Sequence, residues 1–325
     1  MIIKQYGIRS MNYIMRYPRH YAGYAAFSVA FLFLANHHRK SKNEILRIGF
    51  AGSIAQFVTE FIFHPIDVIN TRTKAEISHG NMNSYKMIRR IVDKEGMYGF
   101  WRGASATFYG ALLGGLIYFS TYKSLKNLMK SHENPVHKSR IHTFSYLISS
   151  LLGESMFLVF YYPYDLIRTR MQTRTPGFEY KGPVDGCRRI LNGKIRNFHK
   201  LYVGATPSFI LNLSNQSIMF TVLESMREYY LTKYKLHSVN QLPLNLYLLC
   251  SVAAGVVSGA ATNIMEVVTI HKQVDPTFKF SVFIREQGVK ALTQGLFARV
   301  IINVFHSVTL FFVVDEVSKM FDVEL

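Results

Sequence analysis

One short string occurs three times along this chain. The middle copy, at 161–172, reads YYPYDLIRTRMQ: an apolar run, a proline, an acid, two basic residues and a glutamine. Upstream, 64–72 reads HPIDVINTR, and a more divergent downstream copy at 264–273 reads IMEVVTIHKQ. The acids stand at positions 67, 165 and 266, at nearly equal intervals. Such spacing predicts three related structural units, each with a long helix that ends in the charged string. In the first two units this helix is expected to bend at Pro65 and Pro163.

Six apolar windows, each about as long as a bilayer span, accompany the repeats. They lie at 45–66, 104–122, 143–163, 205–223, 243–270 and 296–314. Few of them carry a central charge, and only short polar segments separate them. This distribution predicts a membrane protein without a separate soluble domain.

The basic charge of the chain lies between the apolar windows. The formal net charge is +18, and the segments 73–100 and 173–203 are basic, whereas the loop 127–142 is milder. A nucleic-acid-binding protein would gather such charge on one face of a soluble module. The distribution therefore favours anionic lipid as the partner and not nucleic acid. If the membrane is the inner mitochondrial one, the positive-inside rule places the two basic segments on the matrix side.

The sequence gives no support for an enzyme or a metal site. Cys187 and Cys250 form neither a disulfide framework nor a metal spacing. His132, His137 and His142 are regularly spaced, but they have no cysteine or acid in register. No pairing of nucleophile and base has motif support, so we expect no catalytic residues and no cofactor.

The triplicated string resembles the signature of the mitochondrial carrier family, Pro-x-(Asp/Glu)-x-x-(Lys/Arg)-x-(Lys/Arg) ending in Gln. The second copy matches it fully. The first has Asn70 in place of a basic residue and Lys74 in place of glutamine, and the third keeps Glu266 and Gln273. A second family signature is intact at 95–103, which reads EGMYGFWRG. The resemblance covers roughly 44–320.

The resemblance implies the fold class. It is an all-α membrane protein with six transmembrane helices in three pseudo-threefold repeats around a central cavity, with short matrix-side helices. The expected divisions are a basic N-terminal extension with an apolar helix at 1–43, and repeats at 44–130, 131–240 and 241–325. The implied location is the mitochondrial inner membrane, which the chain would cross several times.

The resemblance also implies two gates. On the matrix side Asp67 would pair with Arg168, Asp165 would face Thr269, and Glu266 would face Asn70, with Gln172 and Gln273 completing this gate. One charge pair of three would remain. On the cytoplasmic side the expected contacts are Asp315 with Lys126, Glu224 with Ser318, and a repulsive approach of Lys123 to Arg227. Both gates are thus expected to be weak.

Four positions are expected to contact a solute in the cavity. Counted from the helix-start glycines, they are Gly110, Leu211, Asn212 and Ile302. None is charged, which disfavours a nucleotide or dicarboxylate because an unpaired anion is costly to bury. A small neutral or amino-acid-like solute is left open.

Glycines that open helices in this family bind cardiolipin phosphate through free backbone N–H groups, as helix N-termini do in general. Bound cardiolipin is therefore expected at the corresponding glycines of this chain, which are Gly103, Gly182, Gly204 and Gly295.

Two features are additions to the family pattern. The segment 1–43 has seven basic residues and no acid, and its apolar run at 21–35 is short for a span. It suits a helix on the membrane surface or a docking element for another protein. Glu154 lies within a predicted span. An acid there is a candidate functional residue, or is one buried against a partner or facing a wet cavity.

Two functions fit these observations. The weak gates, the uncharged cavity positions and the extension favour a carrier-derived protein with impaired transport. It would be an accessory subunit beside a larger inner-membrane complex, for example one of the respiratory chain. The alternative is a working solute carrier that moves a small metabolite by alternating access.

Overall fold

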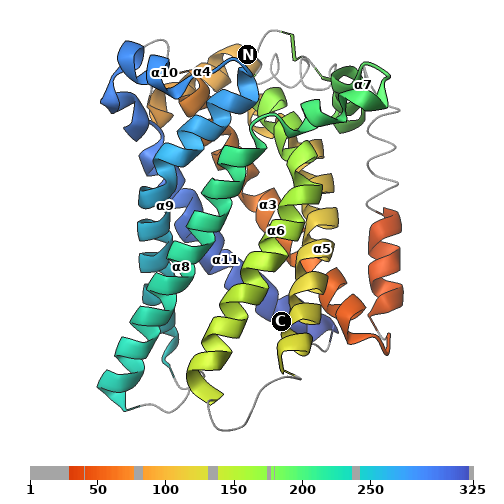
Figure 1. The fold of residues 1–325 in the computed structure, drawn as a ribbon, viewed down its shortest axis with the longest axis vertical. Helices are drawn as coiled ribbons and strands as arrows, with labels where there is room; N and C mark the ends of the chain where they lie inside the picture. The colour runs from red at the N-terminus through yellow and green to blue at the C-terminus, as the bar shows by residue number, and fades with distance from the viewer. Residues whose placement is uncertain are drawn as a thin grey trace, which may run out of the picture.

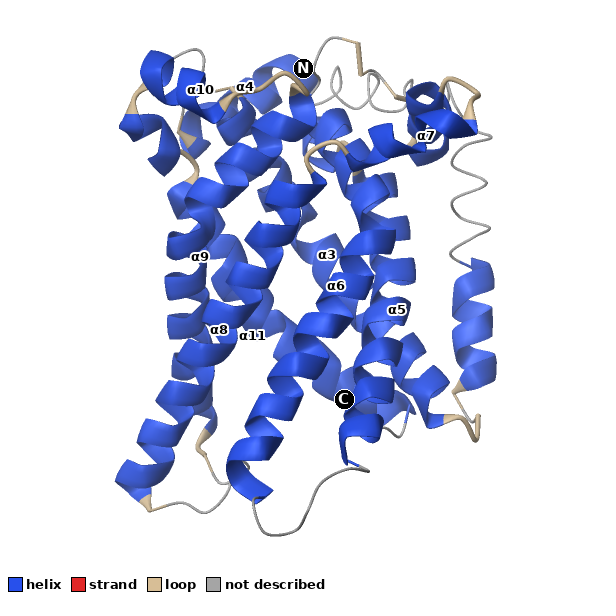
Figure 2. Cartoon of the chain, viewed as in Figure 1, coloured by secondary structure: helices blue, strands red, loops and turns tan. Residues whose placement is uncertain are grey.

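The computed structural model describes residues 29–39, 41–76, 83–130, 138–173, 177–178, 180–235 and 242–321. Within these ranges, the side chains of 126, 129–130, 138–147, 149–150, 195, 310–316 and 318–319 lie outside the description. The described secondary structure is helical (Figure 2).

Three similar units follow one another along the chain. Each has a long helix, a short helix with a 3-10 turn, and a second long helix. The first unit consists of α3 (Glu44–Ala75), α4 (Ser84–Glu95), η2 (Met97–Trp101) and α5 (Ala104–Lys130). The second consists of α6 (Lys138–Thr173), α7 (Pro183–Leu191), η4 (Ile195–Tyr202) and α8 (Ala205–Tyr234). The third consists of α9 (Leu244–Val274), α10 (Phe280–Gln287), η6 (Val289–Thr293) and α11 (Leu296–Phe321). The expected six long helices and three-repeat fold are confirmed.

The six long helices form a closed ring. Each packs on its neighbour in chain order, and α11 packs back on α3. The short helices α4, α7 and α10 all lie at one end of the bundle, at the top of Figure 1. We call this the closed end. The sequence predicts that this end faces the matrix.

Pro163 lies inside α6 without ending it. Proline cannot donate the helical hydrogen bond to the carbonyl four residues earlier, which is that of Val159. The Tyr202 hydroxyl donates to this carbonyl instead, at 2.8 Å. The freed acceptor therefore ties η4 to α6. Pro65 also lies inside its helix, α3.

Three stretches within the described residues are long and apolar enough to cross a membrane, by length and composition. They are Glu44–Ala75, Leu244–Val274 and Val289–Thr309. Polar residues such as Glu154 in α6 and Asn215 in α8 lower the mean hydropathy of their helices.

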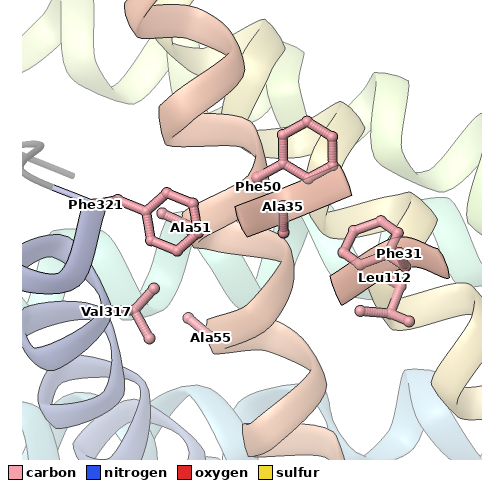
Figure 3. Close-up of a cluster of buried hydrophobic side chains, with 8 residues drawn as sticks. All are labelled: Phe31, Ala35, Phe50, Ala51, Ala55, Leu112, Val317 and Phe321. Atoms are coloured by element: carbon pink, nitrogen blue, oxygen red, sulfur yellow. The ribbon is translucent and has the colours of Figure 1, made fainter. Parts of the chain in front are cut away.

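Part of the N-terminal extension packs on the bundle. A helical segment at 29–38 inserts Phe31 and Ala35 into an apolar cluster with Phe50 of α3 and Phe321 of α11 (Figure 3). Arg39 donates from Nε to the carbonyl of Met320 at 2.5 Å. The rest of the predicted apolar run, at 21–28, lies outside the described residues.

Close backbone contact joins α9 to α11. A Cβ added to Gly255 would lie 2.8 Å from the Cα of Val304 and 3.0 Å from the carbonyl oxygen of Asn303. Because both neighbours are backbone atoms, they cannot move aside as a flexible side chain would. Small residues permit such close packing between membrane helices.

Gly255→Ala should therefore lower the melting temperature of the detergent-purified protein. Overpacking of this kind costs roughly 1–3 kcal/mol, despite the higher helix propensity of alanine. Val256→Leu, at a neighbouring exposed position, is the matched control and should leave the melting temperature unchanged. A stabilised Gly255→Ala protein would contradict the predicted contact.

Candidate functional site

A ring of polar contacts joins α3, α6 and α9 near the closed end. We call it the polar ring. Its members come from the three copies of the repeated string: Asp67, Asn70, Lys74, Asp165, Arg168, Gln172, Glu266 and Gln273. Each pair of helices is joined by an acid on one helix and a donor on the other.

Between α3 and α6, Arg168 forms an ion pair with Asp67 at 2.5 Å. Gln172 donates to the same carboxylate at 2.7 Å. Arg168 also lies 3.6 Å from Glu60 and donates to the Tyr161 hydroxyl at 2.9 Å. The Asp67–Arg168 ion pair is the one that the sequence predicts. Glu60, about two turns earlier on α3, is an additional acid near Arg168.

Between α6 and α9, Gln273 donates to Asp165 at 2.8 Å. The expected partner Thr269 instead donates to the carbonyl of Met265 in its own helix, at 2.8 Å. The prediction that Asp165 contacts Thr269 is therefore wrong. A hydroxyl on a short side chain bonds readily to the carbonyl one turn back, whereas the longer glutamine reaches across.

Between α9 and α3, the expected contact of Asn70 with Glu266 forms at 3.1 Å. Lys74 adds an ion pair to the same carboxylate, and Arg299 of α11 lies 3.2 Å from it. The expectation of one remaining charge pair is therefore wrong. Lys74 occupies the signature's glutamine position, so it supplies the positive charge that Asn70 lacks.

A second layer of contacts links the same three helices through backbone carbonyls. Arg72 donates to the carbonyl of Gln172 at 2.6 Å, and Arg170 donates to that of Gln273 at 2.9 Å. This layer of contacts was not predicted. Its signal in the sequence was the second basic position of the signature, which Arg72 and Arg170 fill in the first two copies.

Three helix-start glycines lie against the polar ring. Gly103, Gly204 and Gly295 have φ of +78°, +81° and +70°, a region that favours glycine. A Cβ on them would contact, respectively, Gln172, Gln273 and Lys74, between 2.7 and 3.4 Å. Gly182 caps α7 with extended backbone, at φ 169°. These positions are packing sites for the ring, and cardiolipin binding at them stays a prediction.

The residues expected in the cytoplasmic gate are arranged differently. Lys123 pairs with Glu44 at 2.9 Å, so the expected repulsion with Arg227 is wrong. Arg227 pairs with Glu224 at 2.8 Å and donates to the Tyr247 hydroxyl at 2.5 Å. These partners belong to the same or the adjacent helix. Lys126, Asp315 and Ser318 lie in described helices, but their side chains are outside the description.

A cavity of about 340 Å³ lies between the long helices, with the polar ring at one end. Leu211, Asn212 and Ile302 line it as predicted, whereas Gly110 packs against Tyr161, 2.5 Å from a built Cβ. The expectation of an uncharged cavity is wrong. Its lining includes these ionisable or amide side chains: Gln56, Glu60, Asp67, Glu154, Asp165, Arg168, Asn212, Asn215, Gln216, Glu266, Arg299, Asn303 and His306. Some of these residues were expected in the matrix gate, but Glu60, Asn215 and His306 were not predicted, because they lie on other turns than the four family contact positions.

The model of the family described as "Mitochondrial carrier protein" matches three segments of the chain, at 41–133, 139–234 and 240–324. The chain belongs to the mitochondrial carrier family. Proteins of this family are membrane-spanning transporters of the mitochondrial inner membrane, and they are not enzymes. The three matched segments correspond to the three structural units around the ring.

Several curated carriers are similar to this chain. Mitochondrial substrate carrier family protein M of Dictyostelium discoideum is 27% identical, over 56% of this chain and 61% of its own. Human solute carrier family 25 member 33 is 28% identical, over 56% and 57%. Mitoferrin of Dictyostelium discoideum is 25% identical, over 55% and 62%. The match thus spans less than two thirds of the length of each of these relatives.

The Lys74–Glu266 pair gives a test of the polar ring. Lys74→Met should lower the melting temperature, because a buried carboxylate then loses one charged partner, at a cost of roughly 1–3 kcal/mol. Glu266→Gln should cost less in the Lys74→Met chain than in the wild type, because there it leaves only Arg299 without its acid. Two independent, additive losses in the double variant would show that the two groups do not interact.

Proposed function

We propose that this mitochondrial carrier is a working solute carrier of the inner mitochondrial membrane that crosses it several times and moves a small metabolite by alternating access. The observation that carries the proposal is the polar ring, because all three contacts between α3, α6 and α9 have a donor and an acid. The chain has exchanged residues between positions and kept a contact at each junction.

Such a ring suits a gate. Its contacts are ion pairs and hydrogen bonds between side chains, and these separate and re-form with little change in buried apolar surface. In a partly wet cavity each contributes a few kcal/mol at most. A bound solute can offset that sum and favour the other state. The polar cavity beside the ring provides the place for the solute.

The accessory-subunit function remains the second candidate. Two of the observations that favoured it no longer hold. The matrix gate is not depleted, because Lys74 pairs with Glu266, and the cavity is lined by charged and amide side chains. The N-terminal addition still favours it. The segment 29–38 packs one face on the bundle and leaves Val29, Leu32 and Phe33 exposed. These side chains would meet lipid or another membrane protein.

Transport is tested in cardiolipin-containing liposomes that hold the full chain, with a panel of amino acids, amines, carboxylates and nucleotides. We expect exchange of at least one solute. Arg168→Ala should reduce it at least about tenfold, because it removes a buried charge partner worth more than about 1.4 kcal/mol. Arg189→Ala, at a half-exposed position of α7, is the control. Exchange that survives Arg168→Ala would contradict a gate built on the ring.

The accessory role is tested by native gel electrophoresis of mild-detergent mitochondrial extracts. If the chain is a subunit of a large complex, it should migrate with that complex, and deletion of residues 1–40 should release it. Substitution of Arg168 should leave this migration unchanged. A free small species in the wild type would contradict the accessory role and leave transport as the function.

A further inference from the structure

The cavity wall on α6 carries a carboxylate that differs from the others. Glu154 lines the cavity, and among the side chains that the structure describes none hydrogen-bonds to it or forms an ion pair with it. The remaining cavity acids have partners: Glu60 and Asp67 have Arg168, Asp165 has Gln273, and Glu266 has Lys74 and Arg299. Glu154 is therefore available to a solute.

Three aromatic rings line the same cavity as this carboxylate, and two of them come from its own helix, α6. Phe157 follows one turn later on α6 and stacks on Tyr161 at 4.6 Å between ring centroids. Tyr118 of α5 meets Phe157 edge to face at 6.5 Å, and its ring lies 3.5 Å from a Cβ built on Gly153. All three rings line the cavity. A carboxylate beside aromatic faces is the arrangement that binds an organic ammonium group, through an ion pair and cation–π contacts.

The charge of the whole lining agrees with a cation. Carboxylates outnumber guanidinium groups there, and both arginines, Arg168 and Arg299, are already paired with acids. A cationic group would thus be attracted, and an anion would lack a free partner. Amides from the opposite helices, among them Asn212 and Asn303, can hydrogen-bond to the rest of the solute.

We infer that the solute of this carrier has a protonated amino group, which pairs with Glu154 between the rings of Tyr118, Phe157 and Tyr161. The inference rests on the proposed transport function and specifies its substrate class. A metal ion fits less well, since the described residues contain no group of three or more histidines, cysteines and acids that could hold one.

The test uses the full chain in liposomes with labelled lysine, putrescine and choline as ammonium probes, malate as the anionic probe and Mn²⁺ as the metal probe. We expect uptake of at least one ammonium probe. Glu154→Gln keeps the shape and removes the charge, so it should reduce that uptake at least about tenfold. Glu154→Asp should retain part of it. Glu228→Gln removes the same charge from an exposed position of α8 and should change nothing.

The outcomes separate this inference from the proposed function. Uptake of malate alone, unaffected by Glu154→Gln, would overturn the ammonium assignment and leave the carrier function standing. Uptake of Mn²⁺ that depends on Glu154 would overturn it in favour of a metal. If no probe enters, the transport proposal fails. Binding at Glu154 is then tested by the melting temperature of the purified protein with each ammonium probe. A probe that stabilises the wild type but not Glu154→Gln supports the assignment, and no stabilisation by any ammonium probe overturns it.

Discussion

The structure depends on a closed cycle of polar contacts among three helices that are far apart in the sequence. Asp67 meets Arg168, Asp165 meets Gln273, and Glu266 meets Lys74. Each contact joins a different pair of the long helices. Because the cycle is closed, each of α3, α6 and α9 is joined to the other two. The short helices, the helix-start glycines and the floor of the cavity are arranged around it.

This cycle shows how a repeated motif can diverge and keep its physical role. Position 70 lost its basic residue, and position 74 has a lysine where the other copies have glutamine. Lys74 is fully buried and reaches the same carboxylate that Asn70 contacts. The long aliphatic stem of lysine allows this, since it crosses apolar surface while its charge reaches the acid. A gate is thus defined by its contacts and not by its positions in the motif.

The cavity adds a second point. Solute recognition in a repeat protein need not follow the symmetry of the repeats, since one solute has no threefold symmetry. Glu154 and its aromatic neighbours belong to one side of the cavity, between α5 and α6. The polar ring, in contrast, takes residues from all three repeats. The asymmetric wall is what can distinguish one solute from another.

The sequence by itself determined the six long helices, the three repeats and the pairing of Asp67 with Arg168. Apolar length and motif spacing are local properties, and a full signature copy carries its own geometry. Only the tertiary structure decided that Gln273 and not Thr269 meets Asp165, and that Lys74 completes the third contact. The physical reason is the length of the side chains. Side chains of different length on different turns can contact the same partner, as Asn70 and Lys74 both contact Glu266. The position of a residue in a motif therefore does not by itself give the contact that its side chain makes.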